Sequence, residues 1–247
     1  MIIFNPEELA KDFRDEEVSF KYLRENSIPI ETLLKNAKIE KLIAPNLNDL
    51  ARLLKVCKLT NPSKIVEFGS GFSSYIFHNY LVNKPEHNES LNYLHIIEVH
   101  KKYMDIACNR FKKSNKKIKV IKDICSVTPN LYRDDGSHKY SANYRFNPDI
   151  IYLDGPDPVD ILNSKFFKNS QRVPISSDIL SIESWLIPGT IVIIDGRIAN
   201  VEYLKNNLKR QWDWSTNYEN DCSIAILKDK PLGKKNIENL KSRGLIK

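Results

Sequence analysis

Five short apolar runs constrain the fold of this 247-residue chain more than any other sequence feature. They are rich in Ile, Val and Leu, and segments of helical character or polar loops separate them. The runs cover residues 64–68, 93–99, 118–124, 149–154 and 190–195. Strands that alternate with helices form a mainly parallel sheet with helices on both faces, so the pattern predicts an α/β fold.

The segments around these runs complete the prediction. Residues 6–60 are expected to be helical, because Asn5-Pro6 begins a helix and residues 45–58 carry leucines on one face. Residues 125–148 are expected to be irregular. Further helices are expected from Ser73 or Ser74 to Val82 and over residues 100–113, 176–186 and 199–208, with a closing antiparallel strand pair at 212–218 and 223–227.

The net charge of +7 is unevenly distributed. Residues 101–122 contain nine Lys or Arg and one acid, and residues 228–247 are also basic. Such segments can bind nucleic acid. No aromatic residues are interleaved as a stacking platform would require, so a solvated helix face and a basic tail are the simpler interpretation. A nucleic-acid partner is not favoured.

Cysteine usage and hydropathy bound the environment of the protein. Cys57, Cys108, Cys125 and Cys222 lie far apart without zinc-ligand spacing, which favours reduced thiols in the cytoplasm. No apolar run approaches the roughly 18–20 residues that span a bilayer. The charged N-terminus does not have the pattern of a signal peptide, so no membrane association is expected.

The loop after the first run carries the most informative motif. Gly69-Ser70-Gly71 lets a ligand approach the backbone closely. The loop matches the dinucleotide motif GxGxxG poorly, and no P-loop GK[ST] follows. Glu67 stands just before the first glycine, where it would repel a pyrophosphate and attract an ammonium group. Taken alone, Glu67 could instead cap the loop.

This arrangement resembles the class I S-adenosylmethionine-dependent methyltransferases over roughly residues 47–228. In that family the acid and glycine loop hold the amino-acid end of the cofactor. Glu98 matches an acid that accepts hydrogen bonds from both ribose hydroxyls, although it could also pair with the basic residues that follow it. Asp123 and Cys125 match the position beside the adenine, and Asp154 matches the motif beside the transferred methyl.

The resemblance implies S-adenosyl-L-methionine as cofactor. It implies a Rossmann-like class I methyltransferase fold with a seven-stranded, mainly parallel sheet and an N-terminal helical extension. The expected divisions are a helical cap at 1–55, a cofactor-binding domain at 56–230 and a basic tail at 231–247. The cofactor-binding residues implied are Glu67, Gly69, Ser70, Gly71, Ser73, Glu98, Val99, Asp123, Cys125 and Asp154.

The fourth-strand motif Asp154-Gly155-Pro156-Asp157-Pro158 bears on the acceptor. It lacks the aromatic residue found where the family methylates exocyclic amines, so N-methylation of a base is disfavoured. The segments FGSGFSS, DGP and PGTIVIID resemble bacterial small-molecule and sugar O-methyltransferases. This implies O-methylation of a small polar acceptor, with a sugar or nucleotide-linked sugar as candidates.

Four residues are catalytic candidates. Asp154 is the first candidate for the general base and His138 the second, although His138 could be a surface loop residue. Asp195 ends the fifth run. Arg197 could bind a phosphate or carboxylate of an anionic acceptor, or pair with Asp195 or Asp157.

A metal site is not favoured by the sequence. The chain also resembles the metal-dependent catechol-type methyltransferases, in which acids end strands four and five and Asn follows the second acid. Asp154 and Asp195 occupy these places, but Gly196 replaces the Asn. Two carboxylates and water could still hold Mg²⁺. No residue is therefore assigned as a metal ligand.

Two other functions remain open at this stage. The run DIIYLDGPDP also resembles the fourth-strand segment of aminopropyltransferases, although their GDGG-type first loop is absent. A nucleic-acid-associated protein could use residues 101–122 as its contact surface. Residues 132–144 and the N-terminal helices are expected to form a wall around the acceptor. A homo-oligomer remains open.

Overall fold

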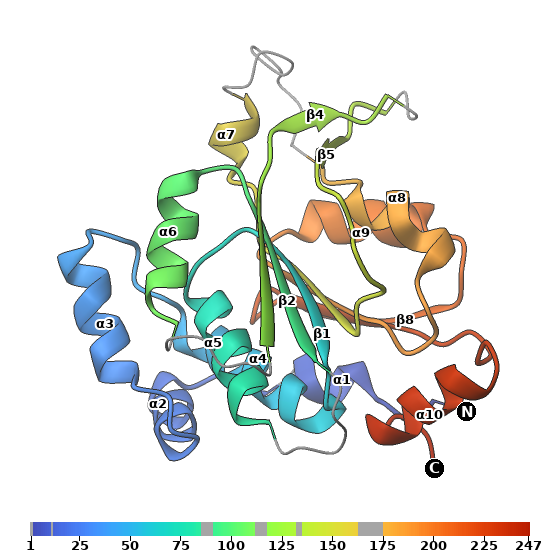
Figure 1. Cartoon of the computed structure of the whole chain (residues 1–247), viewed down its shortest axis with the longest axis horizontal. Coiled ribbons are helices and arrows are strands. Elements are labelled where there is room, and N and C mark those ends of the chain that lie inside the picture. The colour runs from blue at the N-terminus through green and yellow to red at the C-terminus, as the bar shows by residue number, and fades with distance from the viewer. Residues whose placement is uncertain (1, 11, 85–90, 112–117, 132–134, 163–174) are drawn as a thin grey trace.

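A seven-stranded sheet forms the centre of the computed structural model, which describes residues 2–10, 12–84, 91–111, 118–131, 135–162 and 175–247 (Figure 1). The strand order is β3-β2-β1-β6-β7-β9-β8. The first five strands pair in parallel, and β9 and β8 close the sheet antiparallel. The predicted mainly parallel sheet is therefore confirmed. Its strands are β1 (Lys64–Phe68), β2 (Asn92–Glu98), β3 (Ile118–Ile124), β6 (Ile150–Leu153), β7 (Ile191–Asp195), β8 (Trp212–Asn217) and β9 (Cys222–Leu227).

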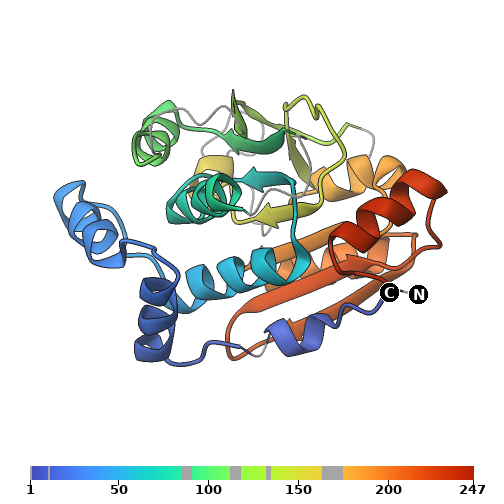
Figure 2. The same cartoon turned by 60° about the horizontal axis from the view of Figure 1, so that its bottom comes forward.

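Helices cover both faces of the sheet, as the sequence predicts (Figure 2). One face packs against α1, α4 and α5, and the other packs mainly against α8 and α9. The α-helices in the described residues are α1 (Pro6–Ala10), α2 (Glu16–Glu25), α3 (Ile30–Ile39), α4 (Leu47–Thr60), α5 (Phe72–Asn83), α6 (Lys101–Asn109), α7 (Pro158–Leu162), α8 (Asp178–Ile182), α9 (Ile198–Asn207) and α10 (Lys234–Ser242).

The two faces of β1 show how strand alternation positions polar residues. Side chains of successive strand residues point to opposite faces. Ile65 belongs to the core beneath α4 and α5, whereas Val66 and Phe68 belong to the core on the other face. Glu67 therefore points toward α5. The same alternation places Tyr152 of β6 on the face of α4 and α5.

A small hairpin in residues 125–148 corrects the expectation of irregular structure. β4 (Val127–Pro129) and β5 (His138–Tyr140) pair antiparallel, and His138 also bridges to Ser176. Three-residue strands are too short to show a hydrophobic period, so no sequence pattern predicts them. The hairpin lies with α7 at the end of the molecule where the parallel strands finish (Figure 1).

Three helices differ in extent from the prediction. α5 begins at Phe72 after Gly71; the hydroxyls of Ser73 and Ser74 donate to Glu67, and the Ser74 oxygen also accepts from the Gly71 N–H at 3.1 Å. α8 is followed by a short 3₁₀ turn, Glu183–Trp185. α6 ends at Asn109, while the expected helix over 100–113 extends into residues 112–117, which lie outside the described residues.

The C-terminal segment is folded, which corrects the expectation of a basic tail at 231–247. α10 docks Leu240 and Leu245 into the core. Arg243 is fully buried, forms an ion pair with Asp149 at 3.3 Å and donates to the carbonyl oxygens of Thr60 and Gly189. The two termini lie together, and Ile3 N donates to Leu245 O at 2.9 Å (Figure 1).

None of the described helices is both long and apolar enough to cross a membrane.

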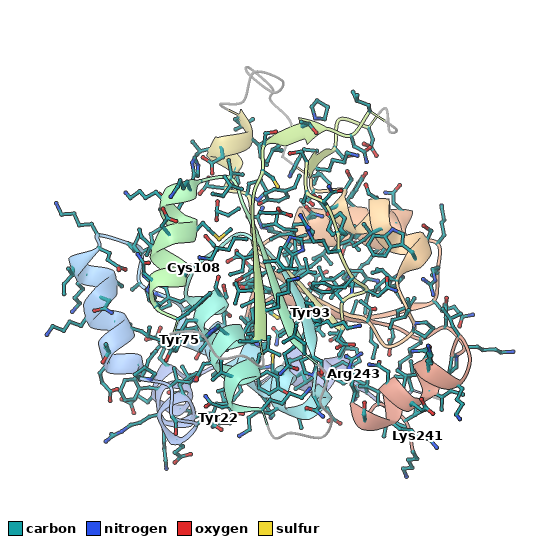
Figure 3. The ribbon with its side chains drawn as sticks, in the orientation of Figure 1. Tyr22, Tyr75, Tyr93, Cys108, Lys241 and Arg243 are labelled. Carbon is teal, nitrogen blue, oxygen red and sulfur yellow. The ribbon has the colours of Figure 1, made fainter. Side chains whose placement is uncertain are left out.

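Replacing Arg243 by Ala is expected to lower the free energy of unfolding by about 3–5 kcal/mol, because Asp149 would be left buried without its cation. Lys241→Ala is the matched control, since Lys241 lies on the exposed side of the same helix (Figure 3). Chemical denaturation of both variants measures the difference. Equal stability of the two variants would show that the Arg243 contacts do not hold α10 in place.

Candidate functional site

The carboxyl ends of four parallel strands bring most of the predicted site residues to one edge of the sheet. Phe68 of β1 is paired with Ile97 of β2 and Leu153 of β6, and Leu153 is paired with Ile194 of β7. The glycine loop, Glu98, Asp154 and Asp195 follow at the next positions of these strands. Ligands of open α/β sheets bind at this edge.

Glu98 is held in a defined orientation by three donors. Its Oε1 accepts from the backbone N–H groups of Val99 at 2.7 Å and His100 at 3.0 Å. Its Oε2 accepts from the Ser70 hydroxyl at 2.7 Å, so the carboxylate links the end of β2 to the glycine loop. A carboxylate held in this way is ready to accept from a ligand hydroxyl, and Ser70 already occupies one such position.

Glu67 makes a different contact from the one expected. It is 1% exposed, and its two oxygens accept from the hydroxyls of Ser73 and Ser74 in the first turn of α5. Burial raises the pKa of Glu67 to about 8, although the hydrogen bonds from Ser73 and Ser74 lower it. In this structure Glu67 and Ser73 therefore tie β1 to α5 and do not present a free carboxylate to a ligand, in agreement with the capping alternative.

The loops after β1 and β6 touch through two glycines. A Cβ atom added to Gly155 would lie 2.6 Å from the Gly69 Cα and 2.7 Å from the Tyr140 hydroxyl. Gly69 has φ of 98°, which disfavours other residues. By contrast, a Cβ on Gly71 would meet nothing within 4 Å. The backbone of Gly71 is therefore open to an approaching ligand, while Gly69 and Gly155 fix the two loops against each other.

The residues expected beside the adenine lie at the ends of β2 and β3. Asp123 contacts the ring of buried His95 at 2.8 Å, a cross-strand contact that already engages its carboxylate. Cys125 is half-buried, its backbone N–H donates to Glu98 O at 2.9 Å, and burial raises its thiol pKa to about 11. Cys125 and the half-buried Val99 therefore lie beside Glu98.

Asp154 is accessible in the turn after β6, yet protein atoms crowd it. The resulting desolvation raises its pKa to about 6, and the positive charge of Arg197 opposes the shift. Arg197 Nη2 donates to the carbonyl oxygens of Asp154 and Pro156, both at 2.9 Å. Arg197 thus orders the turn that carries Asp154, a role that neither sequence interpretation of this residue anticipated.

His138 is buried in β5, which corrects the alternative of a surface histidine. Burial and the nearby charge of Arg197 lower its pKa to about 4. An imidazole with this pKa is neutral at pH 7 and has little affinity for a proton. The burial of His138 and its lowered pKa make it a weaker candidate for the base than Asp154.

A group of residues that the sequence did not indicate joins Asp195 from α4. Asp49 lies close to Asp195 and accepts from Arg52 at 2.7 Å. The Tyr152 hydroxyl donates to Asp195 at 3.3 Å. The i,i+3 spacing of Asp49 and Arg52 in α4 could have indicated an ion pair. The sequence does not indicate that this pair lies next to Asp195.

No set of three His, Cys, Asp or Glu residues that could hold a metal ion occurs among the described residues. The four cysteines are all free thiols.

Comparisons with known proteins bear on the fold. No protein-family model and no curated protein matches the sequence. Among solved structures, a protein described as a caffeoyl-CoA O-methyltransferase from Staphylococcus aureus is similar, with 13% identity, a TM-score of 0.51, and coverage of 86% of this chain and 98% of that chain.

Two further solved structures match over comparable lengths. The O-methyltransferase TomG from Streptomyces achromogenes has 12% identity and a TM-score of 0.49, covering 87% of this chain and 99% of that one. The methyltransferase PaMTH1 from Podospora anserina has 14% identity and a TM-score of 0.48, covering 90% and 93%. At such low identity the likeness to the Staphylococcus aureus protein concerns the fold, and it confirms the predicted Rossmann-like methyltransferase fold.

Gly155→Ala is expected to lower the free energy of unfolding by about 1–3 kcal/mol, because the added methyl group would force the two loops apart. Gly71→Ala should cost less than about 1 kcal/mol, because its surroundings are open and its φ of −178° suits any residue. Thermal and chemical denaturation of both variants test this. A Gly155→Ala protein as stable as Gly71→Ala would contradict the close loop contact.

Proposed function

We propose that the protein is an S-adenosyl-L-methionine-dependent O-methyltransferase that acts on a small hydroxylated molecule. The observation that carries the proposal is the oriented Glu98 carboxylate beside the open backbone of Gly71. These two features offer an acceptor for hydroxyl groups and a close backbone approach at the edge where this fold binds ligands. The similar folds solved as methyltransferases agree with it.

The residues present fit the cofactor. Glu98 would accept from the ribose hydroxyls, with one ligand hydroxyl replacing that of Ser70. Gly69, Ser70 and Gly71 would carry the amino-acid end along the loop. Val99 and Cys125 would border the adenine. When bound, the cofactor supplies an electrophilic methyl group on a sulfonium centre.

Asp154 is the residue that we propose as the general base. With a pKa raised to about 6, most of its carboxylate is ionised at pH 7 and still holds a proton more strongly than an ordinary aspartate. It would take the proton of the acceptor hydroxyl as the oxygen receives the methyl group. Arg197 fixes this carboxylate by holding the carbonyl oxygens on either side of Gly155.

We infer that the acceptor is a polyol such as a sugar or nucleotide-linked sugar. Acids outnumber bases at the acceptor end, where Asp49, Asp154, Asp195 and Asp221 stand near Arg52 and Arg197. Carboxylates accept hydrogen bonds from hydroxyl groups well and repel anions. A neutral hydroxylated region at the reacting end of the acceptor suits this arrangement better than an anionic one.

S-adenosylhomocysteine should bind the wild-type protein with a dissociation constant in the micromolar range, measured by calorimetry. Glu98→Ala should weaken binding about 5- to 150-fold through lost charged hydrogen bonds. Glu183→Ala is the control, because Glu183 is equally buried and also accepts from backbone N–H groups, but far from the site. It should lose stability and keep its affinity. Wild-type protein that gives no binding heat would contradict the proposed cofactor.

Asp154→Asn should lower turnover by about 10²–10⁴-fold and leave S-adenosylhomocysteine affinity nearly unchanged. Because the base works in its deprotonated form, wild-type turnover should fall as pH decreases through about 6. A screen of sugar and nucleotide-sugar acceptors over pH 5–8 measures both effects. Asp157→Asn, three residues later in the same turn, should behave like wild type. Normal turnover by Asp154→Asn would exclude Asp154 as the base.

A further inference from the structure

Arg52 places a buried positive charge at the acceptor end of the candidate site. It lies in α4 and is 2% exposed. Its Nη1 donates to Asp49 Oδ1 at 2.7 Å, and its Nη2 donates to Asp12 O at 3.4 Å. A buried guanidinium is costly unless it neutralises a charge nearby, so its place indicates which carboxylates need a cation.

Asp49 connects this guanidinium to the end of β7. The carboxyl groups of Asp49 and Asp195 lie close enough to interact directly. Burial raises the pKa of both groups, and the charge of Asp49 adds to the rise at Asp195. The Tyr152 hydroxyl donates to the same Asp195 carboxyl group.

The other groups that face this pair come from the end of β6 and the start of β9. Asp154 follows β6, Asp221 precedes β9, and Cys222 begins β9 opposite Asp195. The thiol of Cys222 is neutral, because burial raises its pKa to about 12. The guanidinium of Arg52 is the positive charge that faces these carboxyl groups, through its ion pair with Asp49 at 2.7 Å.

Because Arg52 supplies the positive charge at these carboxyl groups, the site does not suit a divalent cation. Such an ion would have to displace the guanidinium of Arg52 before it reached Asp49 and Asp195. Mg²⁺ and Ca²⁺ need several oxygen ligands. The residue after Asp195 is Gly196, with φ of 62° and no side chain to supply one.

We propose that Arg52 is the built-in cation of the candidate site, which acts through Asp49 to balance the strand-end acid Asp195, so that this acid holds no divalent ion. Arg52 is a positioning residue that acts through Asp49 on Asp195. The proposal rests on the proposed function for its bearing on methyl transfer. The charge pairing itself can be tested without cofactor or acceptor.

The test is the melting temperature of the full chain during titration with MgCl₂ or CaCl₂ at constant ionic strength. Wild-type protein should show no saturable rise. Arg52→Gln should melt about 5–15 °C lower, because the carboxyl pair keeps an unbalanced buried charge. Either divalent ion should then restore part of the loss along a saturable curve, since the vacated place can take a small cation.

Two further variants control the result. Arg110→Gln removes another buried arginine, which pairs with Glu40, so it should lose stability without any cation response. The double variant Asp49→Asn/Arg52→Gln removes both charges, so it should melt above Arg52→Gln and not respond to the ions. If Arg52→Gln does not fold alone, refolding it in CaCl₂ should recover it, whereas the double variant should fold without divalent ions.

Three results would overturn the proposal. These are a saturable response of the wild-type protein, an unchanged melting temperature for Arg52→Gln, and a double variant no more stable than Arg52→Gln. Failure of wild-type protein to bind S-adenosylhomocysteine would count against the proposed function only. The role of Arg52 and the methyltransferase function can therefore be contradicted independently of each other.

Discussion

A parallel sheet covered on both faces leaves room for polar side chains mainly at the ends of its strands, and the rest of this structure depends on that constraint. All four residues of β6 are buried, and β1 and β7 are buried over most of their length. Polar groups therefore gather at the two edges. At the amino edge the polar groups are structural, because Asp149 is neutralised by Arg243, which directly follows α10. At the carboxyl edge several acids meet, and their different partners decide which of them can receive a ligand.

Three buried or half-buried acids at that edge illustrate the difference. Two serine hydroxyls of α5 occupy both oxygens of Glu67. Backbone N–H groups hold one oxygen of Glu98 and leave the other to an exchangeable hydroxyl. Asp195 lies close to Asp49 of α4 and accepts from the Tyr152 hydroxyl at 3.3 Å. These acids look alike in the sequence, since each ends or nearly ends a strand. Their roles follow from the helix that faces them, and strand alternation determines which helix that is.

The parts that the sequence predicted are those governed by local patterns. Apolar runs, helix starts and glycine-rich turns located the strands of the central sheet and most of its helices to within a few residues. The hairpin of β4 and β5 was not predicted, because each strand has only three residues. The docking of α10 was not predicted, because residues 228–247 are basic overall and nothing in their composition distinguishes the buried Arg243. The place of Asp49 and Arg52 at the site was not predicted, because Asp195 lies more than 140 positions away in the chain.

Ligand binding at Glu98 would be an exchange of hydrogen bonds. Its Oε1 already accepts two backbone N–H groups, so a diol must bind at Oε2, where Ser70 now donates. The first ligand hydroxyl would replace a hydroxyl at similar cost, and the gain would come from the second hydroxyl and from contacts with the open backbone at Gly71. Since the backbone N–H groups keep the carboxylate oriented before and after the exchange, little ordering is required of Glu98 itself. Recognition of a ribose would therefore depend on the loop moving Ser70 aside, which couples the glycine loop to occupancy of the site.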